Sequence, residues 1–207
     1  MFDFDDAEGF IFDCDGTLLD TLDAWEEAES SLFALTGTLT QEQEDEIHAA
    51  PIEQAAKIFH ERYGVGESAQ AVLDHLDGFL VPYYGQQAEE MHGALDFVRE
   101  VYKRGIPSVV VSSSPRRYLE AGLDRAGVLE CFEELISTDE VGVSKQDFGI
   151  YEEALRTLGC AKEKTWAVDD APYAIEVMHN FGLKTICVGN RTSPYADLQV
   201  KSLDELL

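Results

Sequence analysis

The stretch Gly9-Phe10-Ile11-Phe12-Asp13-Cys14-Asp15-Gly16-Thr17 decides how this chain is expected to fold. Its first part is a short apolar run without alternation, which is typical of a strand buried on both faces of a parallel sheet. Two aspartates follow the run directly, and in open α/β sheets ligands bind at the carboxyl ends of the strands. The stretch therefore predicts paired carboxylates that act on an electrophile, with a metal ion to screen their repulsion. The alternative is an acidic turn that ends a strand, because Asp and Gly are common turn residues.

The same pattern of apolar runs recurs in the second half of the chain. Further strands are expected at 108–111, 135–136, 165–168 and 185–188, and helices at 94–104, 115–126, 150–158 and 172–181. Glycines punctuate the helices, as in βαβ units. The alternation predicts an α/β fold with a parallel sheet and helices on both of its faces.

Residues 18–90 break this rhythm. They show no convincing strand, and helices are expected at 22–35, after a capping box that begins at Thr40, at 51–63 and at 68–84. We therefore expect a core domain formed by 1–17 and 91–207, with a helical cap domain at 18–90 inserted into it. Because the insert follows the carboxylate pair, it is expected to cover the strand ends and exclude water. A helical domain packed elsewhere is the alternative.

The composition narrows the class of protein. The chain has 207 residues, of which 45% are hydrophobic and 27% charged, as in an ordinary soluble globule. No apolar run is long enough to span a bilayer and no basic-apolar leader is visible, which favours the cytoplasm and no membrane partner. Four dispersed cysteines are expected to be free thiols.

The net charge of −26 argues against a nucleic-acid partner, whose phosphates it would repel. It would equally repel a phosphorylated small molecule. A site for such a molecule therefore needs local positive charge, which a divalent metal ion and a lysine would supply. The acidity of the surface as a whole is interpreted as serving solubility.

Polar side chains follow the later strands or their loops, as the two aspartates follow the first. Ser112 ends the valine run, Lys145 follows a Val-Gly-Val-Ser segment, and Asp169-Asp170 ends the next strand. Carboxylates suit a hard cation such as Mg²⁺, and a lysine with a hydroxyl adds donors for a phosphoryl group.

Structural alternatives remain for each of these groups. Ser112 could cap the helix that follows, although Ser113 or Ser114 is better placed for that role. Lys145 could be an ordinary loop lysine, and one of Asp169 and Asp170 could cap the helix that begins near Pro172. Cys14 is interpreted as a packing residue with a raised thiol pKa. Trp25, Tyr83 and Tyr84 are expected to pack in a core or to line the cap side of a pocket.

Four segments in this order resemble the haloacid dehalogenase superfamily, in the branch with a helical cap after the first motif. They are 12–18, 109–113, Lys145 and 168–170, and the resemblance extends over nearly the whole chain. It is similar to phosphoglycolate phosphatase and β-phosphoglucomutase-like members. The resemblance implies a Rossmann-like core and a Mg²⁺-dependent phosphatase that hydrolyses a small phosphomonoester through an aspartyl-phosphate.

The resemblance also implies a role for each motif residue. Asp13 would be the nucleophile, Asp15 would protonate the leaving oxygen and then activate water, and Lys145 would neutralise the transferring group. Mg²⁺ would be held by Asp13, the backbone carbonyl of Asp15, Asp170 and, directly or through water, Asp169. Phosphate oxygens would be bound by Ser112, Lys145 and the backbone amides of Cys14, Asp15 and Ser113.

The chain departs from the family pattern at several positions outside these motif residues. Gln146 stands where proline usually follows the lysine, Phe148 lies near a second proline position, Ala171 replaces a common serine, Ala174 replaces an expected glycine, and Met91-His92-Gly93 replaces Pro-Gly. Two alternatives to hydrolysis therefore stay open. One is a phosphomutase of the β-phosphoglucomutase type, and the other is a non-catalytic phosphate-binding regulatory module.

Substrate choice is expected to lie in residues 18–90. That segment has two basic residues against sixteen acidic ones, and its expected specificity loop at 49–52 is apolar. We therefore expect the non-phosphate end of the substrate to be neutral, apolar or cationic, and the protein to be a monomer or a homodimer.

Overall fold

The computed structural model describes residues 2–207, apart from the side chains of Asp45, His48 and Ala49. A six-stranded sheet with the order β5-β4-β1-β6-β7-β8 forms the core, and each neighbouring pair is parallel. The strands are β1 (Gly9–Phe12), β4 (Ser108–Ser112), β5 (Glu134–Ser137), β6 (Thr165–Asp169), β7 (Lys184–Val188) and β8 (Leu198–Val200). The predicted α/β class with a parallel sheet is confirmed.

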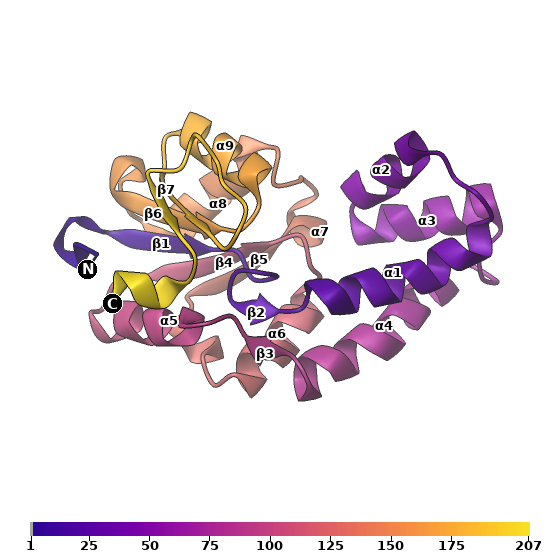
Figure 1. The fold of residues 1–207 in the computed structure, drawn as a ribbon, viewed down its shortest axis with the longest axis horizontal. Helices are drawn as coiled ribbons and strands as arrows, with labels where there is room; N and C mark the ends of the chain where they lie inside the picture. The colour runs from indigo at the N-terminus through magenta and orange to yellow at the C-terminus, as the bar shows by residue number, and fades with distance from the viewer. Residues whose placement is uncertain (1) are drawn as a thin grey trace.

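Helices cover both faces of this sheet (Figure 1). On one face lie α5 (Ala94–Lys103) and α6 (Arg116–Arg125), and on the other lie α8 (Phe148–Leu158) and α9 (Pro172–Phe181). Phe10 and Phe12 of β1 belong to one apolar core and Ile11 to the other, so successive side chains of the strand enter opposite cores. Burial on both faces explains why the first strand is an uninterrupted apolar run.

The order of the strands places a crevice beside β1. From β1 the chain runs outward through β4 and β5, and then crosses to β6 on the other side of β1. Connections therefore leave β1 in opposite directions, which is the topological switch point at which α/β sheets bind ligands.

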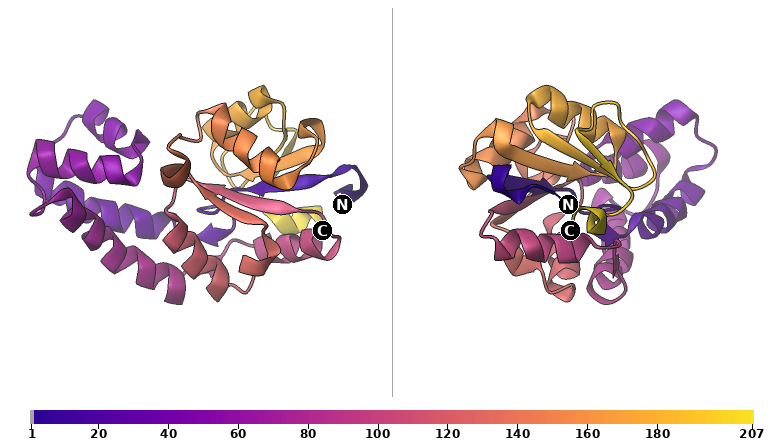
Figure 2. Two further views of the ribbon diagram at one scale, coloured as in Figure 1. Left: turned by 180° about the vertical axis from the view of Figure 1, so that it is seen from behind. Right: turned by 60° about the vertical axis from the view of Figure 1, so that its left-hand side comes forward.

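The segment between β1 and β4 is helical and extends beyond the carboxyl ends of the strands (Figures 1 and 2). It contains α1 (Leu22–Thr36), α2 (Gln41–Ala49), α3 (Ile52–Tyr63) and α4 (Ala69–Gln86). The predicted capping box is confirmed, since Thr40 and Gln43 exchange side-chain and backbone hydrogen bonds at the start of α2. The two helices at the ends of the segment, α1 and α4, pack against each other, and α4 packs on α6 of the core.

Two short strands mark the places where the chain leaves and re-enters the core. β2 (Leu19–Asp20) and β3 (Glu89–Glu90) pair antiparallel, with Leu19 opposite Glu90. The expectation that residues 18–90 contain no strand is therefore wrong at both ends of the segment. Two residues are too few to produce a detectable alternation, and their partner lies far away in the sequence.

The remaining elements are short. They are α7 (Thr138–Val141) and the 3₁₀ turns η1 (Phe4–Asp6), η2 (Leu129–Cys131), η3 (Lys162–Lys164) and η4 (Leu203–Leu206). Across the described residues, no helix combines the length and the apolarity that crossing a membrane would require.

Candidate active site

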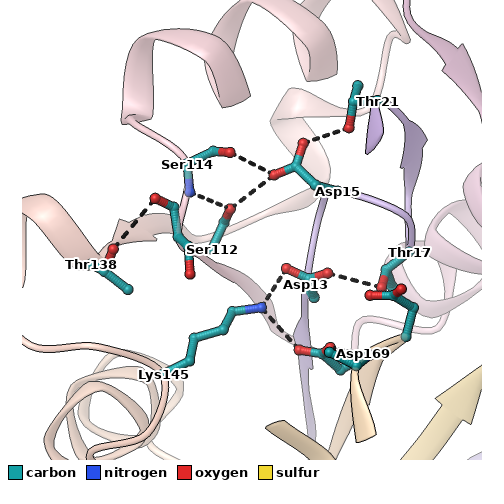
Figure 3. A network of polar contacts seen from close by, with 12 residues as sticks. Asp13, Asp15, Thr17, Thr21, Ser112, Ser114, Thr138, Lys145 and Asp169 are labelled. Atoms are coloured by element: carbon teal, nitrogen blue, oxygen red, sulfur yellow. Dashed lines mark hydrogen bonds and ion pairs between the residues drawn. The ribbon is translucent and has the colours of Figure 1, made fainter. Parts of the chain in front are cut away.

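The carboxyl ends of three neighbouring strands bring the predicted residues together. Asp13 directly follows β1, while Ser112 ends β4 and Asp169 ends β6. The register aligns Phe12 with Val110 and Val168, and the Asp13 amide donates to the Val168 carbonyl at 2.9 Å. Asp13 and Asp169 are therefore placed side by side by the sheet itself, as Figure 3 shows.

A tight loop after β1 fixes the direction of the first motif. The Cys14 carbonyl accepts hydrogen bonds from the amides of Thr17, Leu18 and Leu19 at 3.3, 2.8 and 2.9 Å. Gly16 has a φ of +81°, and a Cβ there would lie 2.8 Å from Leu22. Glycine is therefore required at this turn by both its conformation and its surroundings.

Lys145 forms the electrostatic centre of the site. Its Nζ donates to Asp13 Oδ1 at 2.5 Å and to Asp169 Oδ2 at 2.9 Å, and its side chain is only 6% exposed. Tyr151 of α8 donates to the Lys145 carbonyl at 3.0 Å, which holds the loop in place. The alternative of an ordinary solvent-exposed loop lysine does not describe this residue.

The buried charges in this cluster shift the pKa values of Asp13 and Lys145. Burial raises the pKa of Asp13, and the neighbouring carboxylates of Asp169 and Asp15 add to the rise while Lys145 opposes it. Burial acts to lower the pKa of Lys145, but the attraction of Asp13 and Asp169 outweighs it, so that this pKa lies well above its ordinary value. The ammonium is therefore charged and neutralises carboxylates that would otherwise repel one another.

Three carboxylates form a cluster with the spacing of metal ligands. One oxygen each from Asp13, Asp169 and Asp170 lies within 4.8 Å of the others. Burial, followed by the charge of Asp169, raises the pKa of Asp170 to about 6, while Arg191 opposes the rise from 3.4 Å. A set of oxygen donors with excess negative charge fits a hard divalent cation.

Asp169 and Asp170 differ in how their oxygens are engaged. Asp169 Oδ1 accepts the Ala171 amide at 2.8 Å and its Oδ2 accepts Lys145. Asp170 has the weaker contact with Arg191. The N-cap residue of α9 is Ala171, and no side chain caps this helix. The alternative in which Asp169 or Asp170 caps the helix is therefore wrong.

Four hydroxyl groups donate hydrogen bonds to the carboxylate of Asp15. Its Oδ2 accepts from Ser112 at 3.2 Å and from Ser114 at 2.7 Å. Its Oδ1 accepts from Thr21 at 2.6 Å and from Tyr84. The two acidic groups of the first motif therefore occupy different environments, one in an ion pair and one among neutral donors.

The serines after β4 face the site instead of capping a helix. Ser112 Oγ accepts the Ser114 amide at 2.9 Å, while α6 begins after Pro115 without a side-chain cap. Ser113 lines the cavity and its carbonyl accepts from Thr138 at 3.4 Å. The alternative in which Ser113 or Ser114 caps α6 is therefore wrong.

Cys14 lies between the acidic residues but is fully buried in the apolar core beneath them. Burial, followed by the charges of Asp15 and Asp13, raises the pKa of its thiol well above the ordinary value. Its interpretation as a packing residue agrees with this environment. All four cysteines are free, as expected.

A cavity of about 310 Å³ connects this polar floor to the helical segment. Its roof is largely apolar and includes Leu22, Trp25, Leu32, Ile47, Ile52 and Phe59. Among the described lining residues from 18–90, Glu29 is the charged one. Ala50 and Ile52 of the expected specificity loop line the cavity, while the side chain of Ala49 lies outside the described residues.

Several residues at the site were not singled out as functional from the sequence. Thr17 donates to Asp13 Oδ2 at 3.0 Å, and Tyr173 and Arg191 line the cavity. Ser114 could have been found as the third member of the serine run. Tyr84 was expected to pack in a core or to line a pocket, but its hydrogen bond to Asp15 gives no local signal, because the two residues lie 69 positions apart.

Comparisons with known proteins identify the family to which this chain belongs. The family model described as haloacid dehalogenase-like hydrolase matches residues 10–188. Validoxylamine A 7'-phosphate phosphatase from Streptomyces hygroscopicus subsp. limoneus is 26% identical over 202 residues, which cover 95% of this chain and 94% of that protein. Hexitol phosphatase A from Escherichia coli (strain K12) is 27% identical over 173 residues, covering 82% and 77%.

A solved structure shows the same fold at low sequence identity. β-Phosphoglucomutase from Clostridium difficile superposes with a TM-score of 0.78 at 17% identity, covering 97% of this chain and 93% of that one. The chain therefore belongs to the haloacid dehalogenase-like hydrolase family, as the sequence resemblance predicted.

Replacing Lys145 with methionine tests the electrostatic balance of the cluster. In metal-free buffer, Lys145→Met should lower the free energy of unfolding by about 3–5 kcal/mol near neutral pH, because two buried carboxylates lose their counter-charge. The pKa of Asp13 would rise further, so the folded state would bind a proton that the unfolded state releases. The stability of the variant should therefore keep falling with rising pH above the wild-type Asp13 pKa of about 8, where the stability of the wild type levels off.

Urea denaturation at several pH values measures this effect. Lys164→Met is the matched control, because Lys164 forms an exposed pair with Glu8 at 2.8 Å. This variant should show a small change in stability and the pH dependence of the wild type. A Lys145→Met protein with the stability and pH slope of the wild type would contradict the description of the site.

Proposed function

We propose that this protein is a Mg²⁺-dependent phosphoric monoester hydrolase that acts on a small phosphorylated metabolite through an aspartyl-phosphate on Asp13. The observation that carries the proposal is the convergence of Asp13, Lys145, Asp169 and Asp170 at the floor of one cavity. The names of the relatives support it, since both curated relatives above are phosphatases.

In the first step, a carboxylate oxygen of Asp13 attacks phosphorus and the bond from phosphorus to the ester oxygen breaks. Asp15 gives its proton to that oxygen, so the alcohol leaves neutral. Lys145 lies 2.5 Å from Asp13 and neutralises charge on the nucleophile and on the transferring group. In the second step, Asp15 takes a proton from water as the water oxygen attacks phosphorus, and Asp13 and inorganic phosphate are released.

The carboxylate cluster is the proposed Mg²⁺ site. Asp13, Asp170 and the Asp15 carbonyl would hold the ion, which when bound withdraws charge from the phosphoryl oxygens. Asp169, whose oxygens also accept hydrogen bonds from Lys145 and the Ala171 amide, would hold the ion directly or through water. Asp170, whose pKa is raised in the metal-free protein, would regain a counter-charge.

Phosphate oxygens would be bound by Ser112, Lys145 and the amides of Cys14, Asp15 and Ser113. Ser112 Oγ and Lys145 are both buried, and both approach the carboxyl end of β1 beside Asp13 in Figure 3. Buried donors that are already oriented need little rearrangement when the phosphoryl group enters.

Asparagine in place of Asp13 tests the nucleophile. Asp13→Asn should lower kcat/KM by at least about 1,000-fold, because the amide cannot form the covalent intermediate. Circular dichroism should show an intact fold, and Asp20→Asn, an exposed carboxylate nearby, should retain activity. Near wild-type turnover by Asp13→Asn would refute the proposal, and an isomerised sugar phosphate in place of inorganic phosphate would indicate a mutase.

Metal dependence can be measured without relying on activity alone. Chelation should abolish turnover, and Mg²⁺ should restore it. Mg²⁺ should also raise the thermal midpoint of the wild type, because it binds the folded cluster, and should raise that of Asp170→Asn much less. Equal shifts in both proteins would place the ion elsewhere.

The apolar roof suggests the chemistry of the rest of the substrate. Hydroxyl groups without partners against Leu32, Ile47 and Phe59 would lose hydrogen bonds to water. A panel of phosphate esters assayed with Mg²⁺ should therefore favour esters whose second end is neutral, apolar or cationic. Clear preference for bisphosphates or phosphorylated carboxylic acids would contradict this expectation.

A further inference from the structure

The carboxylate of Asp15 is gripped from two different parts of the molecule. Its Oδ2 accepts hydrogen bonds from Ser112 and Ser114 of the core, and its Oδ1 accepts from Thr21 at the start of the helical segment (Figure 3). Oδ1 also accepts from Tyr84 near the other end of that segment. Thr21 precedes α1 and Tyr84 lies in α4. Each oxygen of this one side chain thus has its own set of partners.

Tyr84 is built into its position by close packing. It is fully buried, and its ring stacks on Tyr118 of α6 with the centroids 5.6 Å apart. Gly122 of α6 makes room for it, because a Cβ at that position would lie 3.0 Å from the Tyr84 ring and 2.6 Å from Leu19. The hydroxyl group therefore has little freedom to move away from Asp15.

Trp25 of α1 fixes the direction of the Tyr84 proton. Its Nε1 lies 2.7 Å from the Tyr84 hydroxyl oxygen. An indole N–H can only donate, so the tyrosine oxygen must accept that hydrogen bond. The hydroxyl proton then points to Asp15 Oδ1, and the chain of donors runs from Trp25 through Tyr84 to the carboxylate.

The direction of these hydrogen bonds determines which oxygen of Asp15 can carry a proton. Oδ1 accepts both the directed Tyr84 proton and a hydrogen bond from Thr21, which together occupy its two lone pairs, so an acid proton there would displace one of these donors. The serine hydroxyls at Oδ2 are not fixed in this way and can rotate to accept. The transferable proton of Asp15 therefore belongs on Oδ2, the oxygen beside Ser112.

We propose that Tyr84, oriented by Trp25, is a positioning residue that holds Asp15 with its transferable proton on Oδ2, facing the phosphoryl site. The assignment rests on the proposed function, in which Asp15 protonates the leaving oxygen. Tyr84 keeps its own proton throughout, while Asp15 gives one proton to the leaving alcohol and takes one from water. Because Trp25 comes from α1 and Tyr84 from α4, the orientation of the Asp15 carboxyl group also depends on the positions of these two helices.

The dependence on leaving group separates this role from a merely structural one. An ester of a good leaving group, p-nitrophenyl phosphate, needs little protonation as its bond breaks, whereas 2-phenylethyl phosphate needs it strongly. Both esters carry one aromatic ring and are similar in size. Because kcat/KM reports the steps up to formation of the covalent intermediate, its ratio between the two esters measures how well the acid is placed.

The experiment compares this ratio in the full-length protein with Mg²⁺. Tyr84→Phe should lower the ratio of kcat/KM for 2-phenylethyl phosphate to that for p-nitrophenyl phosphate by at least about 10-fold. Trp25→Phe should lower it by a smaller factor, since the hydroxyl remains but loses its direction. The double variant should match Tyr84→Phe, because both residues act through one hydrogen bond to Asp15.

Tyr83→Phe is the matched control. It removes a hydroxyl from the adjacent residue of α4, whose contact is with the Asp20 carbonyl at 3.4 Å, and should leave the ratio unchanged. Equal losses for both esters in Tyr84→Phe and Trp25→Phe, or a changed ratio in Tyr83→Phe, would overturn the assignment. Failure of the wild type to hydrolyse either ester, or full activity of Asp13→Asn, would instead overturn the proposed function.

Discussion

The buried ion pair between Lys145 and the carboxylates of Asp13 and Asp169 is the constraint on which the site depends. Negative charges this close, shielded from water, would repel one another strongly without a counter-charge. The parallel sheet places the two aspartates at neighbouring strand ends, and the loop before α8 supplies the ammonium to both. In a chain with a net charge of −26, Lys145 thus supplies local positive charge at these strand ends.

Much of the fold follows from the sequence because the central strands are buried on both faces. The expected runs at 9–12, 108–111, 165–168 and 185–188 all lie in the sheet, and the expected helices all occur. The pairing of β2 with β3 could not be predicted, since it depends on residues that meet only after the helical segment has folded. β8 was likewise missed: it is three residues long at the sheet edge, where less burial weakens the apolar pattern.

The residues at the floor of the site were also predictable, whereas the residues that hold Asp15 in place were not. Asp13, Ser112 and Asp169 follow strand ends, so the topology alone brings them together. The contacts of Asp15 with Thr21 and Tyr84 arise from the packing of α1 and α4 on the core, which no local pattern encodes. Two of the departures from the family pattern are accommodated by the structure: the Ala171 amide donates to Asp169, and Ala174 is fully buried.

The site therefore combines one electrostatic centre with Asp15, the proposed acid, which is held from both the core and the helical segment. Its central claim is that Asp13 becomes covalently phosphorylated during turnover. Rapid acid quenching of the enzyme during hydrolysis of p-nitrophenyl phosphate, followed by mass spectrometry of its peptides, tests that claim most directly. The account predicts a hydroxylamine-labile phosphoryl group on the peptide that contains Asp13; phosphate release with every peptide unmodified, or a modification on another residue, would contradict it.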